Sequence, residues 1–450
     1  MRTVRSEQTE LRTKWAPSVP DGWKIRRMRD AVDLMNGYPF SSELFSNSPE
    51  AGPRIVRIRD LRGDDDPVYW AGSCVDEGHI RNGDILIGMD GDFNVTIWQR
   101  GPAYLNQRMC CVRAREGYSS RFIAYLFPAP LQVINDLTYY TTVKHLSSTQ
   151  VLDIRFPAPP LPTQKAIASF LDRKTAVIDA LIAKKERLIE LLEEKRAALI
   201  NRAVTKGLDP DVPTRATVSP FFPSIPKTWQ MTRVKFVTND IADGPHFSPA
   251  YIEEEDGGVM FISARNVKVD RWQFGDAKFI SHELHEELCK RITPQRGDVL
   301  YTKGGTTGVA RAVDFDRPFH VWVHVAVLRL RQDLVVPEYV AQVLNSSGAY
   351  AQAQLFTRGA TNNDLGLTRM AEIHFPLPSR REQQRVASWL NGRLKTVDEG
   401  KQKIQQQISA LQEYRQSLIT AAVTGQIRTD GSGTTSKPRM AEERDAEGCI

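Results

Sequence analysis

Apolar residues recur at heptad spacing in two long stretches of the chain, 163–208 and 379–427. Within each stretch, mostly polar and charged residues separate the apolar ones. This pattern is typical of helices that bury a narrow apolar seam against a partner helix. At 1.5 Å per residue, each predicted helix is roughly 60 Å long. The seam residues are Ile178, Leu181, Leu188, Leu192 and Leu199 in the first helix, and Val397, Ile404, Leu411 and Leu418 in the second.

The two seams lie at matching places, and each needs a partner of equal length. We therefore expect the two helices to pair with each other as an antiparallel coiled coil. The alternative is that each helix packs separately on its own globular neighbour.

Short runs rich in β-branched and aromatic residues precede each helix, among them 54–58, 95–98 and 319–330. They predict a mixed α/β fold with two globular domains. The expected order is a polar segment (1–15), a first domain (16–162), a long helix (163–208), a second domain (209–378), a second long helix (379–427) and a flexible tail (428–450).

The chain is an internal repeat. Without gaps, Ala168-Ser-Phe-Leu171 aligns with Ala387-Ser-Trp-Leu390, and Ala203-Val-Thr205 with Ala422-Val-Thr424. Further upstream the two copies still align, but the offset between them changes in small steps. There Pro20-Asp-Gly-Trp23 aligns with Pro226-Lys-Thr-Trp229. Segments that diverge between conserved ends behave like loops that carry specificity. The repeat predicts two equivalent halves related by a pseudo-twofold.

Composition excludes several classes of protein. The chain has 450 residues, a formal net charge of +6 and 41% hydrophobic residues, which is typical of a globular protein. No apolar run is long enough for a membrane span, and the polar N-terminus does not resemble a signal peptide. The 5 cysteines form no metal-binding pattern, so we expect a cytoplasmic protein without a metal. The positive excess lies in the helical stretches, since both predicted domains are slightly acidic.

Catalytic motifs are absent from the sequence. Neither a phosphate-binding loop nor a dinucleotide-binding fingerprint nor a methyltransferase tetrad occurs. Asp84 and Asp298 each follow a turn glycine before a strand, so a turn role is favoured over metal binding. His246 is favoured as a loop-packing residue over a base contact. We expect a binding protein with no catalytic residues, which argues against a stand-alone nuclease or methyltransferase.

Two segments resemble the signature of a known family. Ile154-Arg-Phe-Pro-Ala-Pro-Pro-Leu-Pro-Thr-Gln164 and Ile373-His-Phe-Pro-Leu-Pro-Ser-Arg-Arg-Glu-Gln383 look like the Pro-Leu-Pro to Glu-Gln stretch of type I restriction-modification specificity subunits. Thr163 departs from the expected Glu in the first copy. Gly297-Asp-Val-Leu-Tyr-Thr-Lys-Gly-Gly-Thr-Thr-Gly308 also looks like a recurring segment of this family.

The resemblance implies two target-recognition domains that each read one half of an interrupted, asymmetric DNA site, with helices that set the gap. It implies double-stranded DNA, two methylation subunits and, in the full complex, restriction subunits as partners. S-adenosylmethionine, ATP and Mg²⁺ would then be carried by partner subunits, and this chain would hold no cofactor. The alternative is a coiled-coil scaffold that binds only proteins.

Candidate DNA contacts are basic and polar residues in predicted loops, because such side chains reach base edges and phosphates. Lys303, in its glycine-rich loop, is the strongest single candidate. The full set is Arg57, Arg59, Asn94, Arg265, Asn266, Lys303, Thr306, Thr307, Arg358, Asn362 and Asn363.

Overall fold

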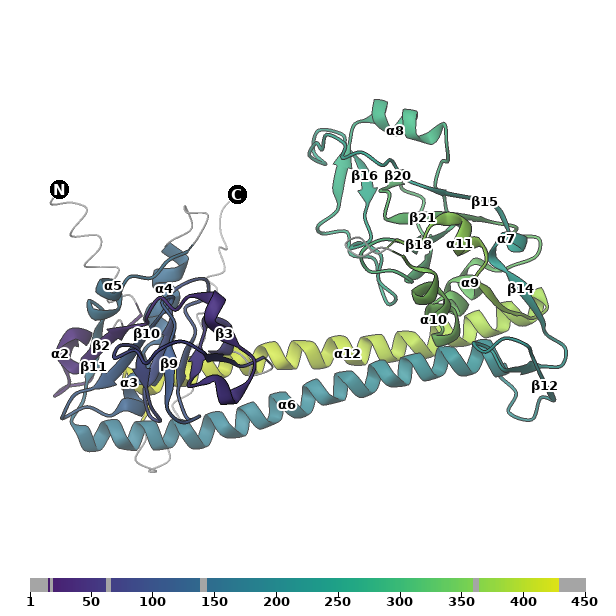
Figure 1. Ribbon diagram of the computed structural model, residues 1–450. Helices are drawn as coiled ribbons and strands as arrows, with labels where there is room; N and C mark the ends of the chain where they lie inside the picture. The colour runs from purple at the N-terminus through teal and green to yellow at the C-terminus, as the bar shows by residue number, and fades with distance from the viewer. Residues whose placement is uncertain (1–14, 17–18, 62–65, 138–143, 359–363, 429–450) are drawn as a thin grey trace, which may run out of the picture. The chain divides into compact units, whose positions relative to one another are not determined.

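The computed structural model describes residues 15–16, 19–61, 66–137, 144–358 and 364–428. It contains two globular halves and two long helices, α6 (Leu161–Lys206) and α12 (Arg380–Val423) (Figure 1). The expected mixed α/β fold with two domains and long helices is confirmed. By contact density the chain divides into unit 1, residues 1–183 and 408–450, and unit 2, residues 184–407. Each unit therefore holds one globular half and a portion of both long helices.

The first globular half contains many short strands and several short helices. Its strands are β1 (Lys24–Arg27), β2 (Val32–Asn36), β3 (Phe45–Ser46), β4 (Arg54–Val56), β5 (Val68–Trp70), β6 (His79–Ile80), β7 (Ile85–Gly88), β8 (Val95–Ile97), β9 (Ala103–Leu105), β10 (Met109–Ala114) and β11 (Arg155–Ala158). Its helices before α6 are α2 (Met28–Ala31), η1 (Ser42–Leu44), η2 (Pro49–Ala51), η3 (Ile58–Leu61), α3 (Ser120–Leu126), α4 (Pro128–Leu137) and α5 (Ser148–Leu152).

The second globular half follows the same plan. Its strands are β12 (Thr214–Ala216), β13 (Ser224–Pro226), β14 (Gln230–Arg233), β15 (Thr238–Asp243), β16 (Val259–Ile262), β17 (Lys278–Ile280), β18 (Val299–Thr302), β19 (Ala310–Ala312), β20 (Phe319–Val321), β21 (Val325–Leu330) and β22 (His374–Leu377). Its helices before α12 are α7 (Val234–Val237), α8 (His282–Cys289), α9 (Pro337–Leu344), α10 (Ser347–Phe356) and α11 (Leu367–Ala371).

Sheet topology repeats between the halves. The four-stranded sheet β2-β10-β7-β8 has its counterpart in β15-β21-β18-β19, and the pair β1-β11 in β14-β22. The parallel pairing of β4 with β9 recurs between β16 and β20. The remaining strands differ, because β4 and β9 belong to a five-stranded sheet whereas β16 and β20 belong to a three-stranded one. The sequence repeat is therefore also a structural repeat.

The glutamine of each signature segment explains why that segment recurs. Gln164 and Gln383 are fully buried, and each donates its side-chain amide to the carbonyl of the proline five residues before it. The Gln164 side chain also accepts from the Ser119 backbone N–H at 2.9 Å, and Gln383 accepts from that of Val336 at 2.9 Å. Each glutamine thereby holds the start of a long helix against its own globular half.

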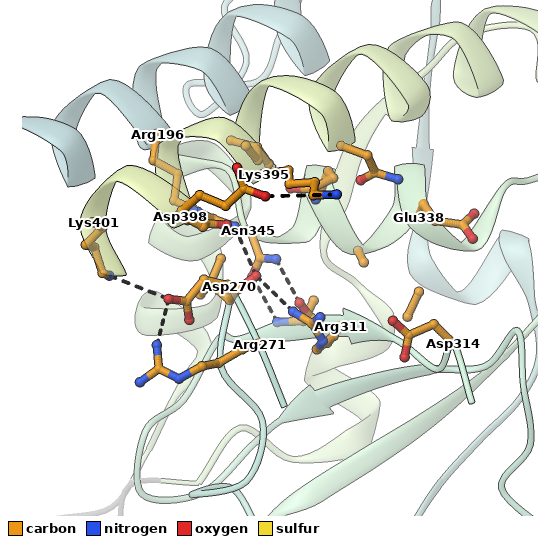
Figure 2. Close-up of a pocket in the computed structure, with 18 of the residues that line it drawn as sticks. Arg196, Asp270, Arg271, Arg311, Asp314, Glu338, Asn345, Lys395, Asp398 and Lys401 are labelled. Atoms are coloured by element: carbon orange, nitrogen blue, oxygen red, sulfur yellow. Dashed lines mark hydrogen bonds and ion pairs between the residues drawn. The ribbon is translucent and has the colours of Figure 1, made fainter. Parts of the chain in front are cut away.

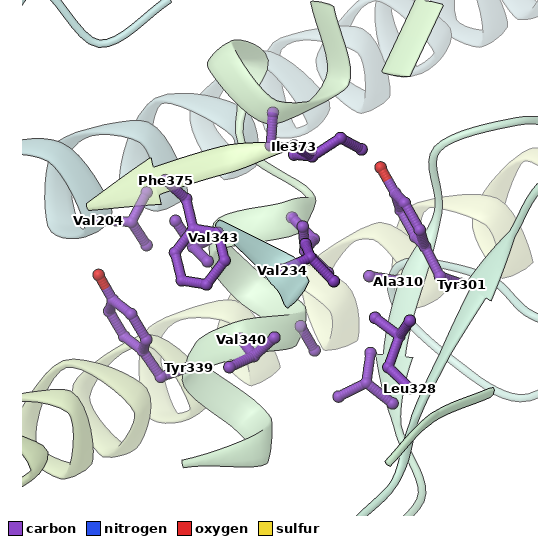
Figure 3. Packing of buried hydrophobic residues seen from close by; sticks show 14 of the residues in the cluster. Val204, Val234, Tyr301, Ala310, Leu328, Tyr339, Val340, Val343, Ile373 and Phe375 are labelled. Atoms are coloured by element: carbon purple, nitrogen blue, oxygen red, sulfur yellow. The ribbon is translucent and has the colours of Figure 1, made fainter. Parts of the chain in front are cut away.

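The far end of each long helix packs on the other globular half. In unit 2, Ile200, Ala203 and Val204 near the end of α6 join a core that also contains Phe375 and Tyr339 (Figure 3). In unit 1, three buried residues at the end of α12 join the core of the first half, namely Ile419, Ala422 and Val423. Each half therefore packs on the start of one long helix and the end of the other: the end of α6 is buried by the half that follows it in the chain, and the end of α12 by the half that is distant in sequence.

Within unit 2, contacts between the long helices are antiparallel. Lys185 donates to Gln407 Oε1 at 2.6 Å, whereas Arg196, further along α6, pairs with the earlier α12 residue Asp398 at 3.3 Å. The Leu192 side chain lies 4.0 Å from the position a Cβ would take at Gly400.

The assignment of Leu181 and Leu188 to the seam is wrong. Leu181 and Leu188 are 42% and 45% exposed, whereas Ile182 and Ile189 are half-buried. In a heptad, spacings of four and three residues alternate, so the face of Ile178 continues through Ile182. The other predicted seam residues are buried or half-buried, namely Ile178, Leu192, Leu199, Val397, Ile404, Leu411 and Leu418.

Candidate nucleic-acid interface

Lys303 lies just after β18 and is buried, with its side chain 5% exposed. Its ammonium group lies 2.9 Å from Asp364 Oδ1 and 3.2 Å from Asp243 Oδ2, and it donates to the Val323 carbonyl at 3.2 Å. The prediction that Lys303 contacts DNA directly is therefore corrected. A buried cation between two carboxylates joins the end of β15 and the segment before α11 to the end of β18.

The glycine-rich loop after Lys303 is shaped by close backbone approach. A Cβ at Gly304 would lie 2.1 Å from a ring nitrogen of His324, and Gly305 and Gly308 have φ values of +71° and +97°. These positions require glycine. Thr306 is exposed at the loop tip, whereas Thr307 is buried, so of these two threonines only Thr306 can reach a ligand without rearrangement.

Arg57 and Asn266 are also buried, and both shape turns. The Arg57 backbone N–H donates to Asp60 Oδ2 at 2.8 Å, and its guanidinium pairs with Asp60 Oδ1 at 3.1 Å. At the repeat-equivalent turn, the Ser263 N–H donates to Asn266 Oδ1 at 2.7 Å. The expectation that Arg57 and Asn266 contact DNA is corrected to a structural role, because their polar groups are used within the turn.

Those turns leave Arg59 and Arg265 exposed at equivalent positions of the repeat. Arg358 is also exposed, and its backbone pairs with that of Asp364. Asn94, between β7 and β8, is half-buried. DNA contact by these residues and Thr306 stays a prediction. Asn362 and Asn363 lie outside the described residues.

The first half carries a related ion cluster at the end of β7, which the sequence did not reveal. The Asp90 carboxylate lies 2.7 Å from Arg108 and 2.8 Å from His145 Nδ1. Burial acts to raise the pKa of Asp90, but hydrogen bonds from His145 and Arg108 outweigh it and lower that pKa. The side chains of Arg108 and His145 are mostly exposed. The available signal was the repeat alignment, in which His145 takes the place of Asp364.

The second half exposes an arginine and a histidine beside its own cluster. Arg291 lies 2.8 Å from Asp243 Oδ1, and His246 lies 3.5 Å from Oδ2 of the same carboxylate. Both side chains are more than half exposed. Each half therefore presents an exposed arginine and an exposed histidine beside a carboxylate at the end of its central sheet, half-buried for Asp90 and buried for Asp243.

Asp84 and Asp298 have the turn role that the sequence favoured. Each accepts a hydrogen bond at 2.9 Å from the backbone N–H three residues earlier, and each pairs with an arginine on a neighbouring strand, Arg113 or Arg329. In the described parts of the chain, no group of three or more His, Cys, Asp or Glu side chains could hold a metal ion. None of the described helices is long and apolar enough to span a membrane.

Comparison with known proteins identifies the family of this duplicated architecture. The profile of the type I restriction modification DNA specificity domain matches residues 20–191 and 226–410. The chain belongs to the type I restriction-modification specificity family. Membership of this family favours DNA sequence recognition over a scaffold that binds only proteins.

Two relatives in the specificity family match the chain over most of its length. The EcoBI specificity subunit of Escherichia coli is 28% identical, with 91% of this chain and 87% of the relative covered. The MjaVIII specificity subunit of Methanocaldococcus jannaschii is 21% identical, with 91% and 94% covered. A chain from a solved structure, described as the basis of complex assembly and conformational transition of the type I R-M system, matches with a TM-score of 0.63 at 15% identity, covering 91% of this chain and 100% of that chain. That match shows a shared fold.

Proposed function

We propose that this chain is the DNA sequence-specificity subunit of a type I restriction-modification complex, and that each globular half reads one half of an interrupted, asymmetric site. The observation that carries the proposal is the duplicated sheet topology with diverged loops. Two copies of one scaffold with different loops suit two different half-sites. Arg59 and Arg265 are exposed at equivalent loop positions, where arginine can reach guanine edges or phosphates.

The long helices act as an antiparallel coiled-coil spacer between the half-sites. Reciprocal ion pairs support this arrangement: Arg196 of α6 pairs with Asp398 of α12, and the repeat-equivalent Arg415 pairs with Asp179 at 2.8 Å. In an isologous pair, each contact occurs twice with the partners exchanged. A helix of 46 residues is about 69 Å long, equal to about 20 base pairs of duplex.

Two methylation subunits dock on the helical spacer and methylate adenine, while restriction subunits complete the assembly. Leu188 and Leu191 of α6 are exposed in unit 2 and can contribute apolar contact area to such docking. S-adenosylmethionine, ATP and Mg²⁺ are bound by the partner subunits, and this chain performs recognition rather than catalysis.

A domain exchange tests the proposal. Residues 16–155 are replaced by the corresponding half of another family member, and methylated sites are mapped by sequencing the host genome. We expect one half-site to change and the other to stay the same. A recognised sequence that stayed unchanged, or that changed in both half-sites, would contradict the two-domain assignment. If the wild-type complex methylated no interrupted site in host DNA, the function itself would be contradicted.

A further inference from the structure

A cavity of about 950 Å³ lies in unit 2, where the second globular half meets α6 and α12. Figure 2 shows that charged side chains from the helices and from the domain converge on it. The domain contributes the loop that contains Val269 and Asp270, together with β19 and α9. Because buried charges are costly unless they are paired, their partners reveal what this junction holds in place.

Arg196 of α6 joins three segments. Its side chain is 10% exposed, its Nε lies 3.3 Å from Asp398 Oδ1 of α12, and one of its terminal nitrogens donates to the Val269 carbonyl at 3.0 Å. Burial raises the pKa of Asp398, although Arg196 opposes that rise. A single guanidinium therefore touches both helices and the domain loop, and its planar fork fixes their geometry.

Lys401 of α12 makes a second three-way junction. Its ammonium group lies 2.9 Å from Glu193 of α6 and 3.6 Å from Asp270 of the domain loop. Burial acts to raise the pKa of Asp270, but the nearby cations Arg271 and Lys401 outweigh it and lower that pKa. The loop is thus tied at consecutive residues, Val269 through its carbonyl and Asp270 through its carboxylate.

The repeat-equivalent positions in unit 1 lack this arrangement. Arg415 aligns with Arg196 but uses two nitrogens on Asp179 of the other helix, at 2.8 and 3.2 Å. Among the described residues of the first half, none makes a hydrogen bond or ion pair with Arg415. Ile182 takes the place of Lys401. A polar contact between the first half and α6 is instead made by Tyr125, which donates to Asp172 at 2.9 Å.

We propose that Arg196 and Lys401 are positioning residues that fix the orientation of the second globular half on the helices, and that this orientation sets which gap between half-sites the complex accepts. The inference rests on the proposed function. One base pair of gap advances a half-site by about 3.4 Å and rotates it by about 35°. A domain tied to both helices at two adjacent loop residues resists such a rotation more strongly than a domain held by its apolar contacts with the helices alone.

The test uses the full chain assembled with its methylation subunits. The double variant Arg196→Met/Lys401→Met keeps side-chain length and removes both junctions, and Arg415→Met is the matched control that removes the helix-to-helix pair with Asp179. The readout is the methylation rate on duplexes that carry both half-sites at gaps from two base pairs shorter to two longer. A second panel varies the bases of each half-site.

We expect the double variant to lose about tenfold in discrimination between the correct gap and its neighbours, with base preferences unchanged, while Arg415→Met keeps the wild-type gap preference. Unchanged gap discrimination in a folded double variant would overturn the inference. If the double variant does not fold, Asp270→Asn, which removes only the loop carboxylate, must relax the gap preference in the same direction or the inference fails. A wild-type complex that methylates no interrupted site would refute the proposed function instead.

Discussion

Replacing Lys303 by methionine removes a buried charge while keeping the length of the side chain. Losing one member of a buried ion pair costs about 3–5 kcal/mol, because the other member is left buried and unpaired. Here the loss is moderated, since Asp364 is 44% exposed and Asp243 keeps Arg291 at 2.8 Å. We therefore expect the lower end of that range, about 3 kcal/mol.

For a domain of this size, 1 kcal/mol shifts the melting temperature by about 2–4 °C. The transition of the second half should therefore fall by about 6–12 °C in calorimetry of the full chain. Arg265→Met is the control, because its side chain is exposed. A Lys303→Met chain that melts within about 1 °C of wild type would refute the argument from burial.

The salt dependence of DNA binding distinguishes a Lys303 that positions the loop from a Lys303 that contacts DNA directly. Each phosphate neutralised by a protein cation contributes about 0.9 to the slope of log affinity against log salt concentration. Because Lys303 is enclosed by Asp243 and Asp364, we expect Lys303→Met to weaken binding by the assembled complex without changing this slope. A slope reduced by about 0.9 in the variant would show that the ammonium group reaches a phosphate.

Three further outcomes follow from buried polar groups. In the native chain, a maleimide should label the exposed Cys74 well before Cys110 and Cys111, whose pKa values burial raises to about 12; labelling at equal rates, read by peptide mass spectrometry, would contradict this. Burial acts to raise the pKa of Asp84, but Arg113 outweighs it and lowers that pKa, which contributes stability above about pH 4 that is lost as the pH falls. The urea midpoint of Asp84→Asn should therefore fall less than that of wild type between pH 5 and pH 3. Equal losses in the two proteins would count against this argument. Gln383→Leu removes the side-chain partner of three backbone groups, of which those of Val336 and Pro378 are buried, and should cost about 3 kcal/mol in urea unfolding. A cost below about 1 kcal/mol would exclude this role.

Much of the fold can be inferred from patterns that act locally. Heptad spacing predicts the long helices, and the aligned segments at Phe156 and Phe375 predict two equivalent halves, because helix periodicity and turn residues operate over a few neighbouring positions. The same logic identifies Asp84 and Asp298 as turn residues. The pattern failed at Leu181, since two faces of one helix were both apolar and only the partner helix distinguishes them.

Residue type alone does not establish exposure, and this limited the prediction of DNA contacts. Lys303, Arg57 and Asn266 have side chains suited to DNA, but the fold surrounds each with partners distant in sequence or within its turn. Arg59 and Arg265 stay exposed because the same turns direct them outward.

Local sequence therefore specifies the elements, their duplication and the family, since these depend on spacing along the chain. Burial, ion-pair partners and the packing of the end of α12 on the first half depend on long-range packing. Arg196 and Arg415 illustrate the difference, because the repeat gives them equivalent positions, yet within the described residues a domain loop bonds to Arg196 and none bonds to Arg415.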